Sequence, residues 1–135
     1  MTLFISVANI HWLPVAVLTI ASFALGMFWH SPVLFGKAWA AENNPAKAPR
    51  KLKVPFIFGG TAVMHFAAIA TLGAIVCGQG MLVGVVAGIT ISALLVFPAM
   101  AGTYLFADRS IKLLFIDVGM YTVLYSLCGL ALGVW

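Results

Sequence analysis

The sequence predicts an all-α polytopic membrane protein with four transmembrane helices packed as two hairpins. Of its 135 residues, 64% are hydrophobic and 7% are charged, whereas charged residues make up about 25% of an ordinary soluble domain. The apolar residues are gathered in stretches that reach the length of about 20 residues needed by a spanning helix. The basic residues fall between these stretches, as they do in the cytoplasmic loops of membrane proteins.

The first predicted span covers residues 9–30. Residues 1–36 contain no Lys, Arg, Asp or Glu. A cleaved signal peptide carries a basic start before its apolar part, so we expect this segment to stay in the mature protein as a helix. Ser31 and Pro32 end it, because proline lacks the N–H and restricts the residue before it.

Residues 31–54 are predicted to form a cytoplasmic loop with a structured start. Phe35 and Trp39 flank Lys37, and aromatic rings around a snorkelling lysine are typical of the headgroup zone. The polar run 42–51 is interrupted by prolines. We expect that run to be a loop in water.

Residues 54–107 must cross the membrane twice. This stretch of 54 residues has no formal charge, and as one helix it would reach about 80 Å, far beyond a hydrocarbon core of about 30 Å. The polar, glycine-rich break at 77–80 divides it. The second and third spans are therefore predicted at 55–76 and 81–106.

The fourth span, 112–135, follows a charged turn at 107–111. With four spans in a single domain, 1–135, both basic loops fall on one face and collect all seven Lys and Arg residues. The positive-inside rule then predicts cytoplasmic basic loops, outward-facing termini and insertion in the cell (inner) membrane. We expect the basic loops to contact anionic lipids, and we expect no nucleic-acid partner, because no solvated basic face is present.

Several polar residues lie inside the predicted spans. Asp117 is the one carboxylate placed there, and it could be an ion or proton site or a hydrogen-bonded helix lock. His65 lies near the middle of the second span, with Tyr121 and Tyr125 at a similar depth. These three could relay a proton or bind a cofactor, or the histidine could make one interhelical hydrogen bond. The candidate intramembrane site comprises Asp117, His65, Tyr121, Tyr125, Thr61 and Ser22.

Small residues recur every four positions on three of the spans. They are Ser22 and Gly26 on the first span, Gly80, Gly84, Gly88 and Ser92 along the third, and Gly129 and Gly133 on the fourth. Residues four apart share one helix face and let backbones approach closely. The ridges predict tight packing within the bundle or against a second copy, so a homo-oligomer or a complex with other membrane subunits is expected. Pro98 predicts a bend in the third span.

Residues 26–39, Gly-Met-Phe-Trp-His-Ser-Pro-Val-Leu-Phe-Gly-Lys-Ala-Trp, resemble the signature of the bacterial membrane family called domain of unknown function 1761. Segments 104–106, 109–113 and 129–135 are similar to that family's closing segments in order and spacing. The resemblance implies a four-helix membrane fold and brings no established activity. Its interfacial signature here is Trp29, His30, Ser31, Pro32, Phe35, Gly36, Lys37 and Trp39.

Two residues depart from the family pattern. His30 stands where a tyrosine is usual, and Asp117 stands where an asparagine is usual. A mechanism that needs an acid at 117 is therefore not expected of the family, although this chain could support one.

The sequence leaves three functions open. HExxH, GxSxG and Walker motifs are absent, so no catalytic residue, metal or cofactor is predicted and an enzyme is not favoured. The favoured function is a homo-oligomeric or complex-forming scaffold subunit. The alternatives are an oligomeric channel or transporter with a path near Asp117, Thr61 and Pro98, and a membrane enzyme or cofactor-binding protein that uses His65, Tyr121 and Tyr125.

Overall fold

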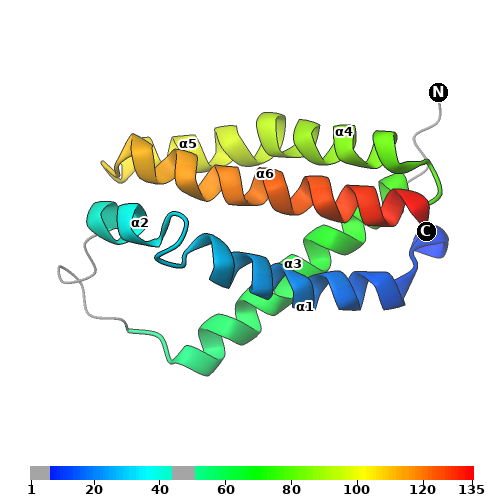
Figure 1. Cartoon of the computed structure of the whole chain (residues 1–135), viewed down its shortest axis with the longest axis horizontal. Helices are drawn as coiled ribbons and strands as arrows, with labels where there is room; N and C mark the ends of the chain where they lie inside the picture. The colour runs from blue at the N-terminus through cyan, green and yellow to red at the C-terminus, as the bar shows by residue number, and fades with distance from the viewer. Residues whose placement is uncertain (1–6, 44–50) are drawn as a thin grey trace.

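The computed structural model describes residues 7–43 and 51–135, and these are helices joined by short turns (Figure 1). Most of the predicted water-exposed run, including Lys47 and Arg50, lies outside the described residues. The elements are η1 (Val7–Asn9), α1 (Trp12–Trp29), α2 (Gly36–Asn43), α3 (Val54–Val76), α4 (Met81–Ile91), η3 (Ser92–Val96), α5 (Phe97–Phe106) and α6 (Ile111–Val134).

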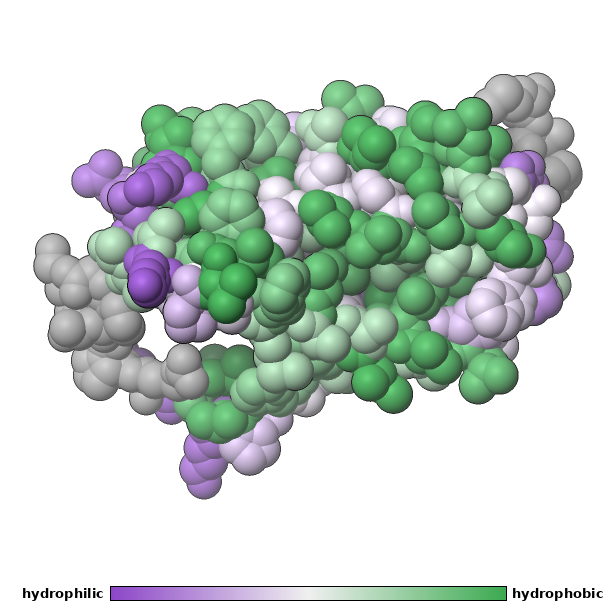
Figure 2. Space-filling view, viewed as in Figure 1, coloured by the Kyte–Doolittle hydropathy of each residue, from purple (hydrophilic) through white to green (hydrophobic). Residues whose placement is uncertain are grey.

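Four helical runs are long and apolar enough to cross a membrane: Trp12–Trp29, Val54–Val76, Met81–Phe106 and Ile111–Val134. Hydrophobic side chains cover the middle of the molecule, and hydrophilic ones gather toward its two ends (Figure 2). The all-α prediction is confirmed for the described part of the chain. The four runs are compatible with a multi-pass membrane protein, while insertion and sidedness stay predictions.

The helices are arranged unevenly. α4 lies antiparallel to α6 in the most extensive contact of the bundle, whereas α3 crosses α1 obliquely (Figure 1). The turn at 77–80 and Trp135 lie at one end of the bundle, and α2 lies at the other end with the turn at 107–110. The main core joins α1, α3 and α6 through Val15, Ile69, Leu72, Val76, Leu124, Cys128 and Leu132.

The contact between α4 and α6 is made backbone to backbone. A Cβ atom added to Gly84 would collide with the backbone of Gly129, and one added to Gly88 would collide with the backbone of Tyr125. The Gly80 N–H donates to the Gly133 carbonyl across 2.9 Å. We call this contact the glycine seam, formed by Gly80, Gly84, Gly88, Gly129 and Gly133. These ridges, which had suggested a second copy, face each other within one chain.

The third apolar run, Met81–Phe106, is continuous but contains a widened turn. Residues Ser92–Val96 form a π-helix, in which the Phe97 N–H bonds to the Ser92 carbonyl. Pro98 follows as the second residue of α5, and its missing N–H removes one bond of a regular helix. The sequence predicts one helix over 81–106 with a bend at Pro98. The structure instead has a widened turn just before the proline, a common device inside helices.

The predicted loop at 31–54 contains a helix. The chain reverses after α1 through backbone bonds from the Phe35 N–H to the Trp29 carbonyl at 3.1 Å and from the Gly36 N–H to the Ser31 carbonyl at 2.9 Å. A Cβ atom at position 36 would collide with the His30 carbonyl. Only glycine therefore fits this reversal, which leads into α2.

Candidate functional site

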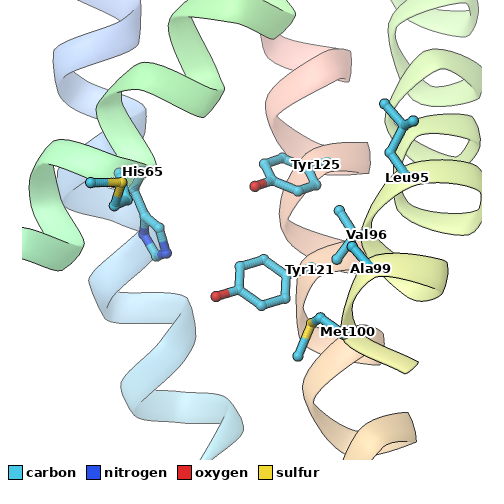
Figure 3. Close-up of a pocket in the computed structure, with 8 residues that line it drawn as sticks. His65, Leu95, Val96, Ala99, Met100, Tyr121 and Tyr125 are labelled. Carbon is cyan, nitrogen blue, oxygen red and sulfur yellow. The ribbon is translucent and has the colours of Figure 1, made fainter. Parts of the chain in front are cut away.

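The structure divides the predicted polar residues into two groups. Asp117 lies among residues of the interfacial signature near α2. His65, Tyr121 and Tyr125 surround cavities on the side of the bundle (Figure 3). Ser22 supports His65 from α1, and Thr61 lines the neighbouring cavity.

Asp117 joins three helices. The Trp39 indole N–H of α2 donates to its Oδ1 at 3.0 Å, and the Tyr104 hydroxyl of α5 donates to its Oδ2. Nε2 of His30 lies 3.7 Å from Oδ1. Both carboxylate oxygens therefore accept hydrogen bonds, and the residue ties α2 and α5 to α6. The two positions that depart from the family pattern are thus neighbours in space.

Further contacts dock α2 and the preceding reversal on α6. The Arg109 guanidinium donates to Asn43 Oδ1 at 2.7 Å and lies 4.8 Å over the Tyr104 ring. The Trp29 indole donates to the Ile116 carbonyl at 3.0 Å. The signature segment is therefore folded and packs against the start of α6.

Other signature residues make contacts within this segment or lie at its surface. The Ser31 hydroxyl donates to the Phe28 carbonyl at 2.7 Å, and the Phe35 ring lies 4.6 Å from that of Trp29. Pro32 and Lys37 are exposed. Tyr104, which is buried, was missed as a site residue because no spacing rule links it to Asp117. In the sequence it stood out only as part of the segment 104–106 that is similar to the family.

Two adjoining cavities open on the side of the bundle. Their volumes are about 510 and 500 Å³, and both are lined by Met64, His65 and Tyr121. We call them together the tyrosine groove. The first cavity is also lined by Leu95, Val96, Ala99, Met100 and Tyr125. The second is also lined by Leu52, Phe56, Ile57, Gly60 and Thr61. No Lys, Arg, Asp or Glu is among these lining residues in the described parts of the chain.

The groove has an apolar wall and a polar wall. Leu95, Val96 and Ala99 come from η3 and α5, and the two tyrosine hydroxyls point toward the side of His65 (Figure 3). The Tyr121 ring lies 6.3 Å from the imidazole, edge to face. It lies 5.9 Å from the Tyr125 ring, nearly parallel to it.

Three polar atoms of the groove lack partners within residues 7–43 and 51–135. They are Nε2 of His65 and the hydroxyl oxygens of Tyr121 and Tyr125. Every buried side-chain nitrogen or oxygen in that part of the chain has a partner, so these three atoms, on residues that line the groove, are at least partly exposed. Thr61 differs, because its hydroxyl donates to the Ile57 carbonyl at 2.7 Å. No set of three His, Cys, Asp or Glu residues in the described ranges could hold a metal ion.

Comparison with protein families matches residues 13–133 to the family described as "Protein of unknown function (DUF1761)". Neither a curated protein nor a solved structure matches the chain. The match covers nearly the whole sequence, from the first turn of α1 to the end of α6. The chain therefore belongs to the DUF1761 family, the family that its signature segment resembled.

Proposed function

We propose that this chain is a multi-pass membrane protein that binds a neutral lipophilic molecule in the tyrosine groove, through a polar group on that molecule. The observation that carries the proposal is the set of three unpartnered polar atoms inside an otherwise apolar groove. In a bilayer, a polar atom without a partner costs several kcal/mol, roughly, because lipid tails offer no hydrogen bond. A ligand that pairs with these atoms would remove that cost.

The shape and charge of the groove support a lipophile rather than an ion. The volume of each of its two cavities falls in the range of about 300–1,000 Å³ that is usual for small-molecule sites. Its lining includes Met64 and Met100, whose flexible side chains adapt to varied apolar shapes. A charged ligand would find no charged lining residue to pair with, whereas an apolar chain could lie against Phe56 and Ile57 in the second cavity.

The two other functions that the sequence left open have less support. The scaffold prediction rested on the small-residue ridges and on the scarcity of reactive groups, and α6 fills the ridge of α4 within the same chain. A transport path through Asp117 and Thr61 has less support, because both oxygens of Asp117 are engaged by Trp39 and Tyr104. An oligomer stays a prediction.

The proposal includes an orientation in the membrane. Lys37 lies in α2 and Lys53 directly before α3, while Arg109 lies in the turn before α6 and Lys112 in the first turn of α6, all toward one end of the bundle (Figure 1). By the positive-inside rule this end faces the cytoplasm and contacts anionic lipids. The groove would then open to the hydrocarbon core.

A pair of alkylbenzenes tests the proposal. We expect para-nonylphenol to raise the melting temperature of the purified protein saturably, because a bound ligand stabilises the folded state. Nonylbenzene, which lacks the polar group, should raise it far less. Ala99→Phe fills the first cavity and should weaken phenol binding by at least about tenfold. Ala67→Phe, on an exposed part of α3 outside the groove, is the matched control. Equal phenol binding by both variants would contradict the proposal.

A further inference from the structure

The Ser22 hydroxyl fixes the position of the proton on His65. Ser22 is 2% exposed, and its Oγ lies 2.6 Å from the Thr19 carbonyl oxygen and 2.7 Å from His65 Nδ1. A carbonyl oxygen only accepts hydrogen bonds, and a hydroxyl has one proton to give. If that proton pointed at His65, two oxygens would face each other at 2.6 Å with no proton between them. Ser22 therefore donates to Thr19, and His65 Nδ1–H donates to Ser22.

This assignment determines what His65 presents to the groove. A neutral imidazole that carries its proton on Nδ1 has a bare lone pair on Nε2. A doubly protonated imidazole would be a cation in a groove with no acidic lining residue in the described chain, which is costly in an apolar setting. The Nε2 atom is therefore a fixed hydrogen-bond acceptor.

The tyrosines do not discriminate between ligands in the same way. A phenolic hydroxyl can rotate and can donate or accept. The Tyr121 and Tyr125 hydroxyls thus adapt to either kind of ligand atom, whereas His65 does not. From these contacts we infer that the groove selects a lipophilic molecule bearing a hydroxyl, an alcohol or phenol, which donates to His65 Nε2 and accepts from a tyrosine. This inference rests on the proposed function and names its ligand class.

Ser22 is then a positioning residue that acts through His65. Replacing it with alanine removes the acceptor of the Nδ1 proton. The imidazole of Ser22→Ala is free to carry its proton on Nε2 instead and to donate into the groove. The variant should therefore lose the preference for ligand donors while the groove itself stays intact.

The inference is tested with para-nonylphenol and para-nonylanisole, which differ in that the ether oxygen has no proton to donate. We expect the wild-type protein to bind the phenol at least about tenfold more tightly, the effect of one well-made hydrogen bond. In Ser22→Ala the ratio should fall to within about threefold. Ser126→Ala is the control, because Ser126 also bonds within its helix, to the Thr122 carbonyl, but does not line the groove.

Nitrogen NMR of isotope-labelled histidine reads the proton position directly, with His65→Gln used to identify the His65 signals. We expect a protonated Nδ1 and a bare Nε2 whose signal moves on adding the phenol and not the ether. A proton on Nε2 would overturn the inference. Equal binding of the phenol and the ether would also overturn it, and if Ala99→Phe still abolishes that binding, the proposed function stands. If neither probe binds saturably, the proposed function fails, and the nitrogen spectrum still decides the state of His65.

Discussion

Two neighbouring stretches of α6 are packed in opposite ways. Toward α4, the glycine seam brings two backbones together with no side chain between them. Beside the seam, around Tyr121 and Tyr125, cavities of about 510 and 500 Å³ remain open, and the two tyrosine hydroxyls have no partners in the described chain. Residues of α6 spaced four apart thus form a rigid seam at Gly129 and Gly133 and the wall of a groove at Tyr121 and Tyr125.

The difference separates residues that hold the fold from residues that are free to bind. In lipid, close backbone approach supplies helix association that the hydrophobic effect cannot supply. The glycine seam can therefore carry much of the stability and leave the neighbouring groove incompletely packed. Substitutions in the seam and in the groove should have very different consequences for stability.

The largest effect is expected at the seam. Gly88→Leu places a side chain against the backbone of Tyr125 and Ser126, and neither helix can yield without separating from the other. We expect a loss of folded protein in mild detergent, beyond the roughly 1–3 kcal/mol typical of an overpacked core. Size-exclusion chromatography and thermal unfolding would measure it.

Gly102→Leu is the matched control for Gly88→Leu. Gly102 lies farther along the same apolar run, and a Cβ atom added there meets no atom within 4 Å. It should behave like the wild type. Similar losses in both variants would show that the seam does not bear the stability assigned to it.

An intermediate effect is expected at Asp117. Asp117→Leu leaves the Trp39 N–H and the Tyr104 hydroxyl without their shared acceptor, at a cost of about 1–3 kcal/mol for each group that stays buried. Asp117→Asn should be tolerated, because its oxygen can accept from Trp39 while its NH₂ donates to Tyr104. Thermal unfolding of both variants checks this. A leucine variant as stable as the asparagine variant would argue against a lock at this position.

The smallest effect on stability is expected at the groove. Tyr125→Phe removes a hydroxyl that has no partner in the described chain, so its unfolding free energy should change by less than about 0.5 kcal/mol. The same substitution at Tyr104 removes a hydrogen bond to Asp117 and should cost about 1 kcal/mol. Thermal unfolding of the two variants side by side measures the difference. If Tyr125→Phe is the more damaging, the groove is part of the structural core.

The helices were predictable because length alone limits where an apolar stretch can cross a bilayer. The uncharged stretch 54–107 had to be divided, and the break at 77–80 was its one polar interruption. The grouping of His65 with the tyrosines followed from counting residues along two helices. Such counting gives depth but not rotation, so the sequence could not show which polar atoms lack partners.

The contacts of Asp117 could not be predicted from the sequence, for a different reason. Asp117 lies one turn before Tyr121, and the sequence placed both in one candidate intramembrane site. The two are separated because α2 folds back over Asp117, and that return depends on the reversal at Gly36. A contact between residues 39 and 117 is set by tertiary folding, and no local pattern encodes it.

The π-helix has a consequence for comparing relatives of this chain. A widened turn holds one extra residue, so every later position is rotated by about 100° from where a regular helix would put it. Beyond it, Phe97 and Tyr104 pack with residues of α6, whereas Ala99 lines the groove. In a relative one residue shorter between 92 and 96, these residues would be turned by about 100° away from those contacts. A single gap there in an alignment would therefore mark a helix that turns a different face to α6 and to the groove, and not a neutral change of length.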